Sequence, residues 1–382
     1  MNLLDPVEPR YGHDSLADIL PTALSFLGVA GEPDALNLAA ELDGVRRVAV
    51  VLLDGMGWHQ LPLAAADAPT MTDIVAGRLG LGRPITSGFP STTPVSLVTL
   101  GTGTTPGHHG IVGFNLLRPG TGKILNHLHW TGDPDPAVWQ PVPTAFTRAS
   151  EAGLAPTVVT NPRFTDTGLT VSAYRGARLG PGIEADAVAE EMLAALSSSR
   201  LVYGYLPDVD RAGHDFGIAT PEWHQAAADA DRLVTRLVDG LPPDTALIVT
   251  ADHGQLDIPP DTRIDVDRDP RLTEGVTFVA GEARVRYLHT VEGARADVLS
   301  TWRDVLGERA WVVERAEAVA AGWFGPVPES HLQRIGDVVA VCRDRWVLMA
   351  SRHEPPRLNS MIAFHGSNTT AEMEIPLLVV RR

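Results

Sequence analysis

The chain has 382 residues, 44% of them hydrophobic and 20% charged, and a formal net charge of −16, as in a globular protein with a large buried core. It contains no Lys/Arg cluster for the backbone of a long nucleic acid, no apolar run of the roughly 18 to 20 residues that cross a membrane, and no signal-peptide segment in residues 1–20. Without such segments we expect a cytoplasmic protein. Because Cys342 is the single cysteine, we expect no intramolecular disulfide, and histidines and carboxylates would hold any metal. The oligomeric state stays open.

Strand-like apolar runs alternate with helical stretches along the first part of the chain. Helical periodicity appears in 183–196 and 222–237, and the apolar runs are 47–53, 155–160, 201–206, 247–250 and, near the end, 375–380. This alternation predicts an α/β fold, in which helices flank a mainly parallel central sheet.

The pattern changes between residues 261 and 358. Short strand-like runs at 284–289, 311–313, 337–342 and 346–350 surround helical segments there. We interpret 261–358 as a smaller inserted α+β cap. The core would then consist of residues 1–260 and of a last part, 359–382, which returns with His365 and a final strand.

Polar residues follow the predicted strands. Asp54 ends the first run within Asp-Gly-Met-Gly, Asp210 and His214 follow the third, and Asp252 with His253 follows the fourth. Alone, each is as well explained as a turn or helix-cap residue, and a lone histidine such as His365 is usually structural. Together they offer oxygen and nitrogen ligands at the sheet edge where α/β proteins bind their ligands.

A hydroxyl-rich segment lies between the first two of these positions. In Phe89-Pro90-Ser91-Thr92-Thr93-Pro94, the second proline favours a helix that opens directly after Thr93. The positive end of that helix would stabilise an alkoxide or a phosphoryl oxygen beside it. An ordinary helix cap is the alternative, and for this segment alone it is the better one.

Taken as a set, these residues match a two-metal centre, in which two cations about 4 Å apart clamp the attacking and leaving oxygens of an in-line displacement.

The same segments resemble the nucleotide pyrophosphatase/phosphodiesterase branch of the alkaline phosphatase superfamily. In that branch Phe-Pro-Thr/Ser-x-Thr carries the nucleophile, and Thr-Gly-x-x-Pro-x-x-His-Gly-Ile-Val follows. Here 89–93 is followed by that second motif at 102–112, and the ungapped alignment selects Thr93 over Thr92. The family's Asp-x-x-Gly-His, Asp-His-Gly and late His-Gly elements match residues 210–214, 252–254 and 365–366.

This resemblance implies a metal-dependent hydrolase that cleaves a phosphodiester or pyrophosphate bond through a phosphothreonine at Thr93. It implies that Asp54, Asp252 and His253 hold one divalent metal, and that Asp210, His214 and His365 hold the other. The ligand types favour zinc, with manganese as the alternative. The expected partner is a small phosphorylated substrate, for which a nucleotide is one candidate.

One departure from the family pattern concerns the substrate. The asparagine that holds a nonbridging phosphoryl oxygen usually stands two positions after Ile-Val, where this chain has Phe114, and Asn115 follows it. We therefore expect Asn115 to contact the substrate after a small loop shift. A phosphomutase or phosphotransferase, a phosphonate hydrolase and a non-catalytic metal-binding protein remain alternatives.

Overall fold

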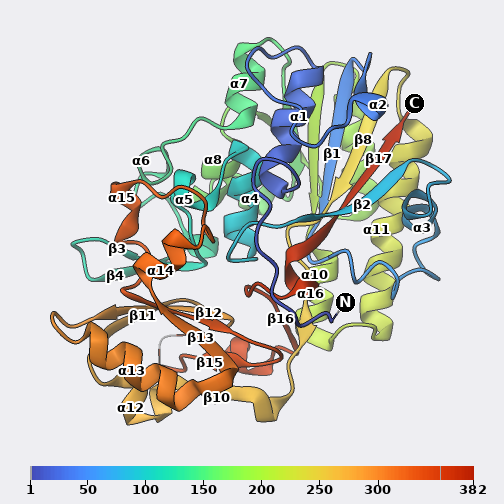
Figure 1. The fold of residues 1–382 in the computed structure, drawn as a ribbon. Helices are drawn as coiled ribbons and strands as arrows, with labels where there is room; N and C mark the ends of the chain where they lie inside the picture. The colour runs from blue at the N-terminus through green and yellow to red at the C-terminus, as the bar shows by residue number, and fades with distance from the viewer. Residues whose placement is uncertain (1, 353) are drawn as a thin grey trace.

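The computed structural model describes residues 2–352 and 354–382, which form an α/β structure around a seven-stranded sheet (Figure 1). The strand order is β2 (Leu81–Thr86), β17 (Glu374–Arg381), β8 (Thr245–Thr250), β1 (Arg47–Leu53), β7 (Leu201–Leu206), β5 (Thr157–Thr160) and β6 (Arg178–Pro181). All neighbours from β8 to β6 are parallel, and β17 runs antiparallel to both β8 and β2. The predicted α/β fold with a mainly parallel sheet is confirmed.

Helices cover both faces of this sheet. One layer contains α1 (Ile19–Phe26), α4 (Thr93–Thr102), α7 (Ala145–Glu151) and α8 (Gly168–Tyr174), and the other contains α3 (Pro69–Val75), α9 (Ala185–Ala195), α10 (Asp208–Phe216) and α11 (Pro221–Gly240). Since both faces are covered, the central strands are buried on both sides and their sequences are continuously apolar. Val48 to Leu53 of β1 are all buried.

A second, antiparallel sheet lies at the lower left of Figure 1, beside α12 (Pro270–Thr273) and α13 (Arg295–Leu306). We call it the cap sheet. Its order is β13 (Ala310–Glu314), β14 (Val338–Cys342), β12 (Val285–Thr290), β11 (Val276–Glu282), β3 (Asn115–Arg118) and β4 (Lys123–Asn126). The strands β3 and β4 come from the segment that the sequence assigned to the core, so the cap sheet draws on both sides of the expected boundary at residue 260.

Short paired segments connect the two parts. The pairs are β9 (Leu256–Asp257) with β16 (Ala363–Phe364), and β10 (Arg263–Asp265) with β15 (Val347–Met349). The remaining α-helices are short: α2 (Ala39–Leu42), α5 (Pro106–His109), α6 (Pro136–Trp139), α14 (Arg315–Ala320), α15 (Glu329–Leu332) and α16 (Thr370–Met373). The segment β16 to β17 thus leads the chain back to the main sheet, where β17 is the second strand from the β2 edge.

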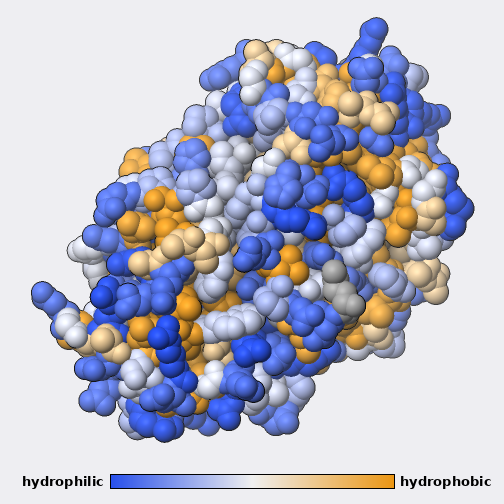
Figure 2. All heavy atoms as spheres, in the orientation of Figure 1, coloured by the Kyte–Doolittle hydropathy of each residue, from blue (hydrophilic) through white to orange (hydrophobic). Residues whose placement is uncertain are grey.

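Hydrophilic and hydrophobic side chains are interspersed over the face shown in Figure 2. Large apolar side chains are exposed at scattered positions, among them Val138, Ile183 and Phe216. Among the described residues, no helix has the length and apolar character that a bilayer crossing requires.

Candidate metal centre

The candidate ligands come from the carboxyl-end edge of the parallel strands. Asp54 follows β1, Asp252 and His253 follow β8, and α10, which starts two residues after β7, carries Asp210 and His214. His365 follows β16 on the returning segment. The tight fit requires Gly55, whose φ is +75° and where a Cβ would lie 2.8 Å from Cα of Asp210.

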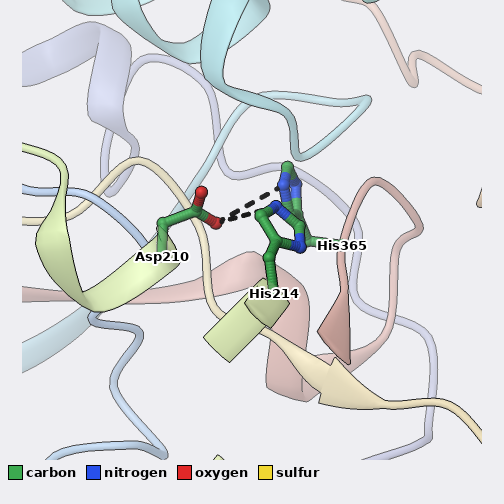
Figure 3. A group of neighbouring side chains, drawn as sticks. All are labelled: Asp210, His214 and His365. Carbon is green, nitrogen blue, oxygen red and sulfur yellow. Dashed lines mark ion pairs between the residues drawn. The ribbon is translucent and has the colours of Figure 1, made fainter. Parts of the chain in front are cut away.

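Asp210, His214 and His365 form one group (Figure 3). The Nε2 atoms of His214 and His365 lie 3.3 and 3.6 Å from Oδ1 of Asp210, and both imidazoles are turned toward that carboxylate. Asp210 and His214 are four residues apart on α10, which places them on one helix face.

A second group surrounds His253. Its Nε2 lies 3.2 Å from Oδ2 of Asp252 and 3.6 Å from Oδ1 of Asp54. Ligand atoms of Asp54, Asp210 and His253 also lie within 4.8 Å of one another, so Asp210 is within reach of both groups. The rings of His253 and His365 stack with centroids 3.5 Å apart, which joins the two groups.

The hydrogen bonds of the histidines fit a cation at each group. Nδ1 of His214, His253 and His365 lies 2.7, 3.2 and 2.9 Å from the carbonyl oxygens of Ala363, Gly254 and Ser91 respectively. A carbonyl only accepts, so each Nδ1 donates its proton, and the rings of His253 and His365, whose pKa values burial lowers, keep an Nε2 lone pair.

These lone pairs face carboxylate oxygens, which are acceptors too. The buried atoms Asp54 Oδ1 and Asp252 Oδ2 have no hydrogen-bond partner. Acceptors that face acceptors in a buried site are the arrangement that a divalent cation would satisfy.

The pKa shifts agree with this arrangement. Burial, followed by the charges of Asp252 and Asp210, raises the pKa of Asp54 well above its usual value. Burial and the charge of Asp210 raise the pKa of Asp252 to about 7. Burial lowers the pKa of His253 to about 3 and lowers that of His365 well below its usual value, so both rings stay neutral, as ligands must.

Thr93 adjoins the second group. It is the first residue of α4, with Thr92 as the N-cap, so the helix begins one residue earlier than expected. Its Oγ1 lies 3.2 Å from Nε2 of His253, and it is only partly buried. The structure therefore brings Thr93 and all six candidate ligands together.

Two residues that the sequence analysis did not single out contact the ligands. The hydroxyl of Tyr205 donates a hydrogen bond to Oδ2 of Asp54, and burial raises the pKa of Tyr205 far enough to keep that proton. Gln255 Nε2 donates to Oδ1 and to the main-chain oxygen of Asp210, at 2.5 and 3.1 Å. A tyrosine inside an apolar strand gives no signal in a single sequence, whereas a glutamine directly after Asp-His-Gly was a visible clue.

Asn115 lies in the cap sheet. Its Nδ2 donates to the carbonyl of Gly281 at 3.1 Å, and its Oδ1 accepts from Asn126 at 3.0 Å. Over residues 2–352 and 354–382, no hydrogen bond joins it to Thr93 or to a candidate ligand. Its contact with a substrate stays a prediction.

The chain is similar to known proteins in sequence and in fold. The chain is 23% identical over 257 residues to ectonucleotide pyrophosphatase/phosphodiesterase 1 of Saccharomyces cerevisiae, a match that covers 55% of this chain and 34% of that relative. The chain thus spans about a third of the length of this curated relative.

Two groups of solved structures share the fold. An inactive variant of murine ectonucleotide pyrophosphatase/phosphodiesterase 5 in complex with AMP has a TM-score of 0.71 and 20% identity, over 87% of each chain. Phosphonoacetate hydrolase from Sinorhizobium meliloti in complex with phosphonoformate has a TM-score of 0.68 and 22% identity, over 89% of this chain and 91% of the other. Residues 48–368 match the family described as type I phosphodiesterase / nucleotide pyrophosphatase, and the chain therefore belongs to this family, a branch of the alkaline phosphatase superfamily.

Proposed function

We propose that this protein is a two-metal hydrolase that cleaves a phosphodiester or pyrophosphate bond through a phosphothreonine at Thr93. The observation that carries the proposal is the set of three imidazole Nε2 atoms turned toward carboxylate oxygens beside a hydroxyl. Asp54, Asp252 and His253 would hold one divalent ion, and Asp210, His214 and His365 the other. Asp210 also reaches the first group, so it can bridge the two.

The ions, when bound, would stabilise negative charge on the attacking and leaving oxygens. Oγ1 of Thr93 would release its proton to solvent and attack phosphorus. The bond from phosphorus to the leaving oxygen would break as the new ester bond forms, and the leaving oxygen would keep the electron pair and take up a proton from solvent. The amino end of α4 places partial positive charge beside the transferred group, which supplies part of the electrostatic stabilisation of phosphoryl transfer. Water would then hydrolyse the phosphothreonine and regenerate Thr93.

The donor set favours zinc, with manganese as the alternative. The substrate would be a small phosphorylated molecule. Two observations support a nucleotide: the family's description names nucleotide pyrophosphatase activity, and the similar murine protein was solved with AMP. Rates on nucleotide diesters, simple phosphodiesters, monoesters and phosphonates, measured with defined metals, rank these classes directly.

The principal test replaces the nucleophile. Thr93→Ala should lose all turnover of a chromogenic phosphodiester while it keeps its metal content, since Thr93 is not among the six ligands. Thr93→Ser keeps a hydroxyl and should retain part of the activity. Full activity in Thr93→Ala would remove this residue from the mechanism. Reaction in ¹⁸O-labelled water distinguishes a hydrolase, which incorporates the label into its product, from a phosphotransferase.

A further inference from the structure

The two carboxylates of the group around His253 each have one oxygen held by the protein and one that is free. Oδ1 of Asp252 accepts from the main-chain N–H groups of Gly55 and His253, both at 3.1 Å. Oδ2 of Asp54 accepts from the hydroxyl of Tyr205. Among the described residues, the other two oxygens, Asp252 Oδ2 and Asp54 Oδ1, have no hydrogen-bond partner, and they lie 3.2 and 3.6 Å from Nε2 of His253. The free oxygens thus gather around the candidate ligand atom of the histidine.

The two carboxylates are oriented by different means. The main chain itself orients Asp252, through two N–H groups that every substitution would leave in place. The main chain of Asp54 is also fixed, because its N–H donates to the carbonyl of Leu206 and its carbonyl accepts from the N–H of Asp210, both at 3.0 Å. These bonds do not restrict the side-chain torsions of Asp54. Within residues 2–352 and 354–382, Tyr205 is the one hydrogen-bond donor to its carboxylate, so Tyr205 decides which oxygen of Asp54 stays free.

Tyr205 is itself held firmly. It lies on β7 opposite Leu52 of β1, and Asp54 stands two residues beyond Leu52, so the alternation of side chains places Tyr205 and Asp54 on the same face of the sheet. Its side chain is 9% exposed and belongs to the main hydrophobic core. Tyr203, two residues earlier on the same face, is fully buried, and its hydroxyl accepts from the hydroxyl of Tyr174 at 3.2 Å. One strand therefore carries two similar buried tyrosines, of which Tyr205 contacts a candidate ligand.

A hydrogen bond of this kind changes how a carboxylate can bind an ion. A carboxylate without a partner can turn or offer both oxygens, whereas one whose second oxygen accepts from a fixed hydroxyl offers a single oxygen in a single direction. Residues that orient metal ligands in this way commonly contribute to metal affinity, although they do not contact the ion.

We propose that Tyr205 is a positioning residue of the metal centre, which holds Oδ2 of Asp54 and thereby presents Oδ1 alone to an ion bound by Asp54, Asp252 and His253. This inference rests on the two-metal centre proposed above and gives it a residue that acts through a ligand. It predicts an effect on one of the two ions. Over the described part of the chain, no hydrogen bond joins Tyr205 to the ligands of the other group, Asp210, His214 and His365.

Two single substitutions compare the two tyrosines. Tyr205→Phe removes the hydroxyl and keeps the ring in the core. Tyr203→Phe is the matched control, because it makes the same change on the same strand and face, at a hydroxyl that is bonded to Tyr174 and not to a ligand. Zinc is titrated into each metal-free protein by calorimetry with a competing chelator, which resolves the two binding steps, and melting temperatures show that each variant is folded.

Tyr205→Phe should weaken one zinc-binding step by about 10- to 100-fold and leave the other within about threefold of the wild type, whereas Tyr203→Phe should leave both within about threefold. With cobalt in place of zinc, the visible absorption of the weakened step should also differ from that of the wild type in Tyr205→Phe and not in Tyr203→Phe, since Asp54 then binds in another geometry. In Asp54→Ala protein, which lacks the ligand, adding Tyr205→Phe should change the remaining zinc affinity by less than about threefold, because Tyr205 acts through Asp54.

Equal zinc affinities of the wild type and Tyr205→Phe in both steps would overturn the proposal, as would an unchanged cobalt spectrum. A loss of the same size in Tyr203→Phe, or one that persists in Asp54→Ala protein, would show a structural role instead and overturn it too. A wild-type protein that binds no zinc would overturn the metal centre and this inference together. Since zinc binding needs no turnover, these measurements and the Thr93 test fail independently.

Discussion

Replacement of Gln255 by leucine isolates the role of the hydrogen bonds that orient Asp210. Gln255 is fully buried, and its amide donates to both the carboxylate and the main-chain oxygen of Asp210. The pocket is fitted to this amide, because a Cβ on Gly213 would lie 1.9 Å from its Oε1. Leucine has a similar volume and no donor, so the change removes two hydrogen bonds and little packing.

The magnitude follows from these contacts. The bond to the carboxylate is worth about 1.5 to 3 kcal/mol and the bond to the carbonyl about 1 kcal/mol. Leucine also removes Oε1, which has no partner, and this offsets part of the loss. We expect a net loss of about 2 kcal/mol in the free energy of unfolding. Zinc affinity should fall about 10- to 100-fold, the usual effect of losing a residue that orients a metal ligand.

The assay is zinc competition with a chromogenic chelator, accompanied by urea denaturation of the metal-free protein. Gln60→Leu is the matched control, because Gln60 is also buried but donates to the main-chain oxygen of Gln255, at 2.9 Å, and not to a ligand. It should lower stability and leave zinc affinity unchanged. A folded Gln255→Leu protein whose zinc affinity lies within about twofold of the wild type would refute the reasoning.

Three further predictions concern stability. Arg284 and Glu372 form a fully buried ion pair with contacts of 2.9 and 2.6 Å. Arg284→Met should therefore lower the free energy of unfolding by about 3 to 5 kcal/mol, and Arg284→Met/Glu372→Leu should lower it by less, because no unpaired charge is left buried. Urea denaturation of both variants checks this, and an equal or larger loss in the double variant would contradict it. Burial lowers the pKa of His127 to about 4, below its unfolded value of roughly 6.5. The free energy of unfolding should therefore be highest above about pH 6.5 and fall by about 2 kcal/mol between neutral pH and about pH 5, because the unfolded chain takes up the proton first. Denaturation curves of His127→Asn should show a shallower pH dependence. Metal removal by a chelator should lower the melting temperature, and added zinc should restore it. The reason is that a ligand at about 1,000 times its Kd stabilises the folded state by about 4 kcal/mol. Calorimetric scans that are identical with and without chelator would exclude tight metal binding to the folded protein.

The sequence predicted those parts of the fold in which local pattern and burial agree. The strands β1 and β7 are buried on both faces and appear in the sequence as unbroken apolar runs with the observed boundaries. The strand β2 was missed because Gly82, Arg83 and Pro84 give it no strand pattern, and its place is fixed by pairing with β17. Likewise β6 is a short strand that ends in Gly180 and Pro181 at the sheet edge, where proline is tolerated.

The site divides in the same way. Asp54, Asp210 and Asp252 could be selected because each follows an apolar strand, and the parallel order brings those strand ends together. The contacts of Tyr205 with Asp54 and of Gln255 with Asp210 could not be predicted, because they join side chains that are distant in sequence. The sequence also could not predict that Asp210 lies within reach of both ligand groups, because the resemblance associates it only with His214 and His365.

The position of β17 has a consequence for biosynthesis. This strand lies between β8 and β2, and β2 joins the main sheet only through it. During translation, residues 81–86 leave the ribosome nearly 300 residues before their partner strand β17. The edge of β8 that pairs with β17 therefore stays unpaired until the cap has been made. A nascent chain therefore cannot complete the set of candidate metal ligands early, and the proposed activity should arise only when the final residues are inserted. Chaperones that shield unpaired strand edges would be expected to bind during this interval.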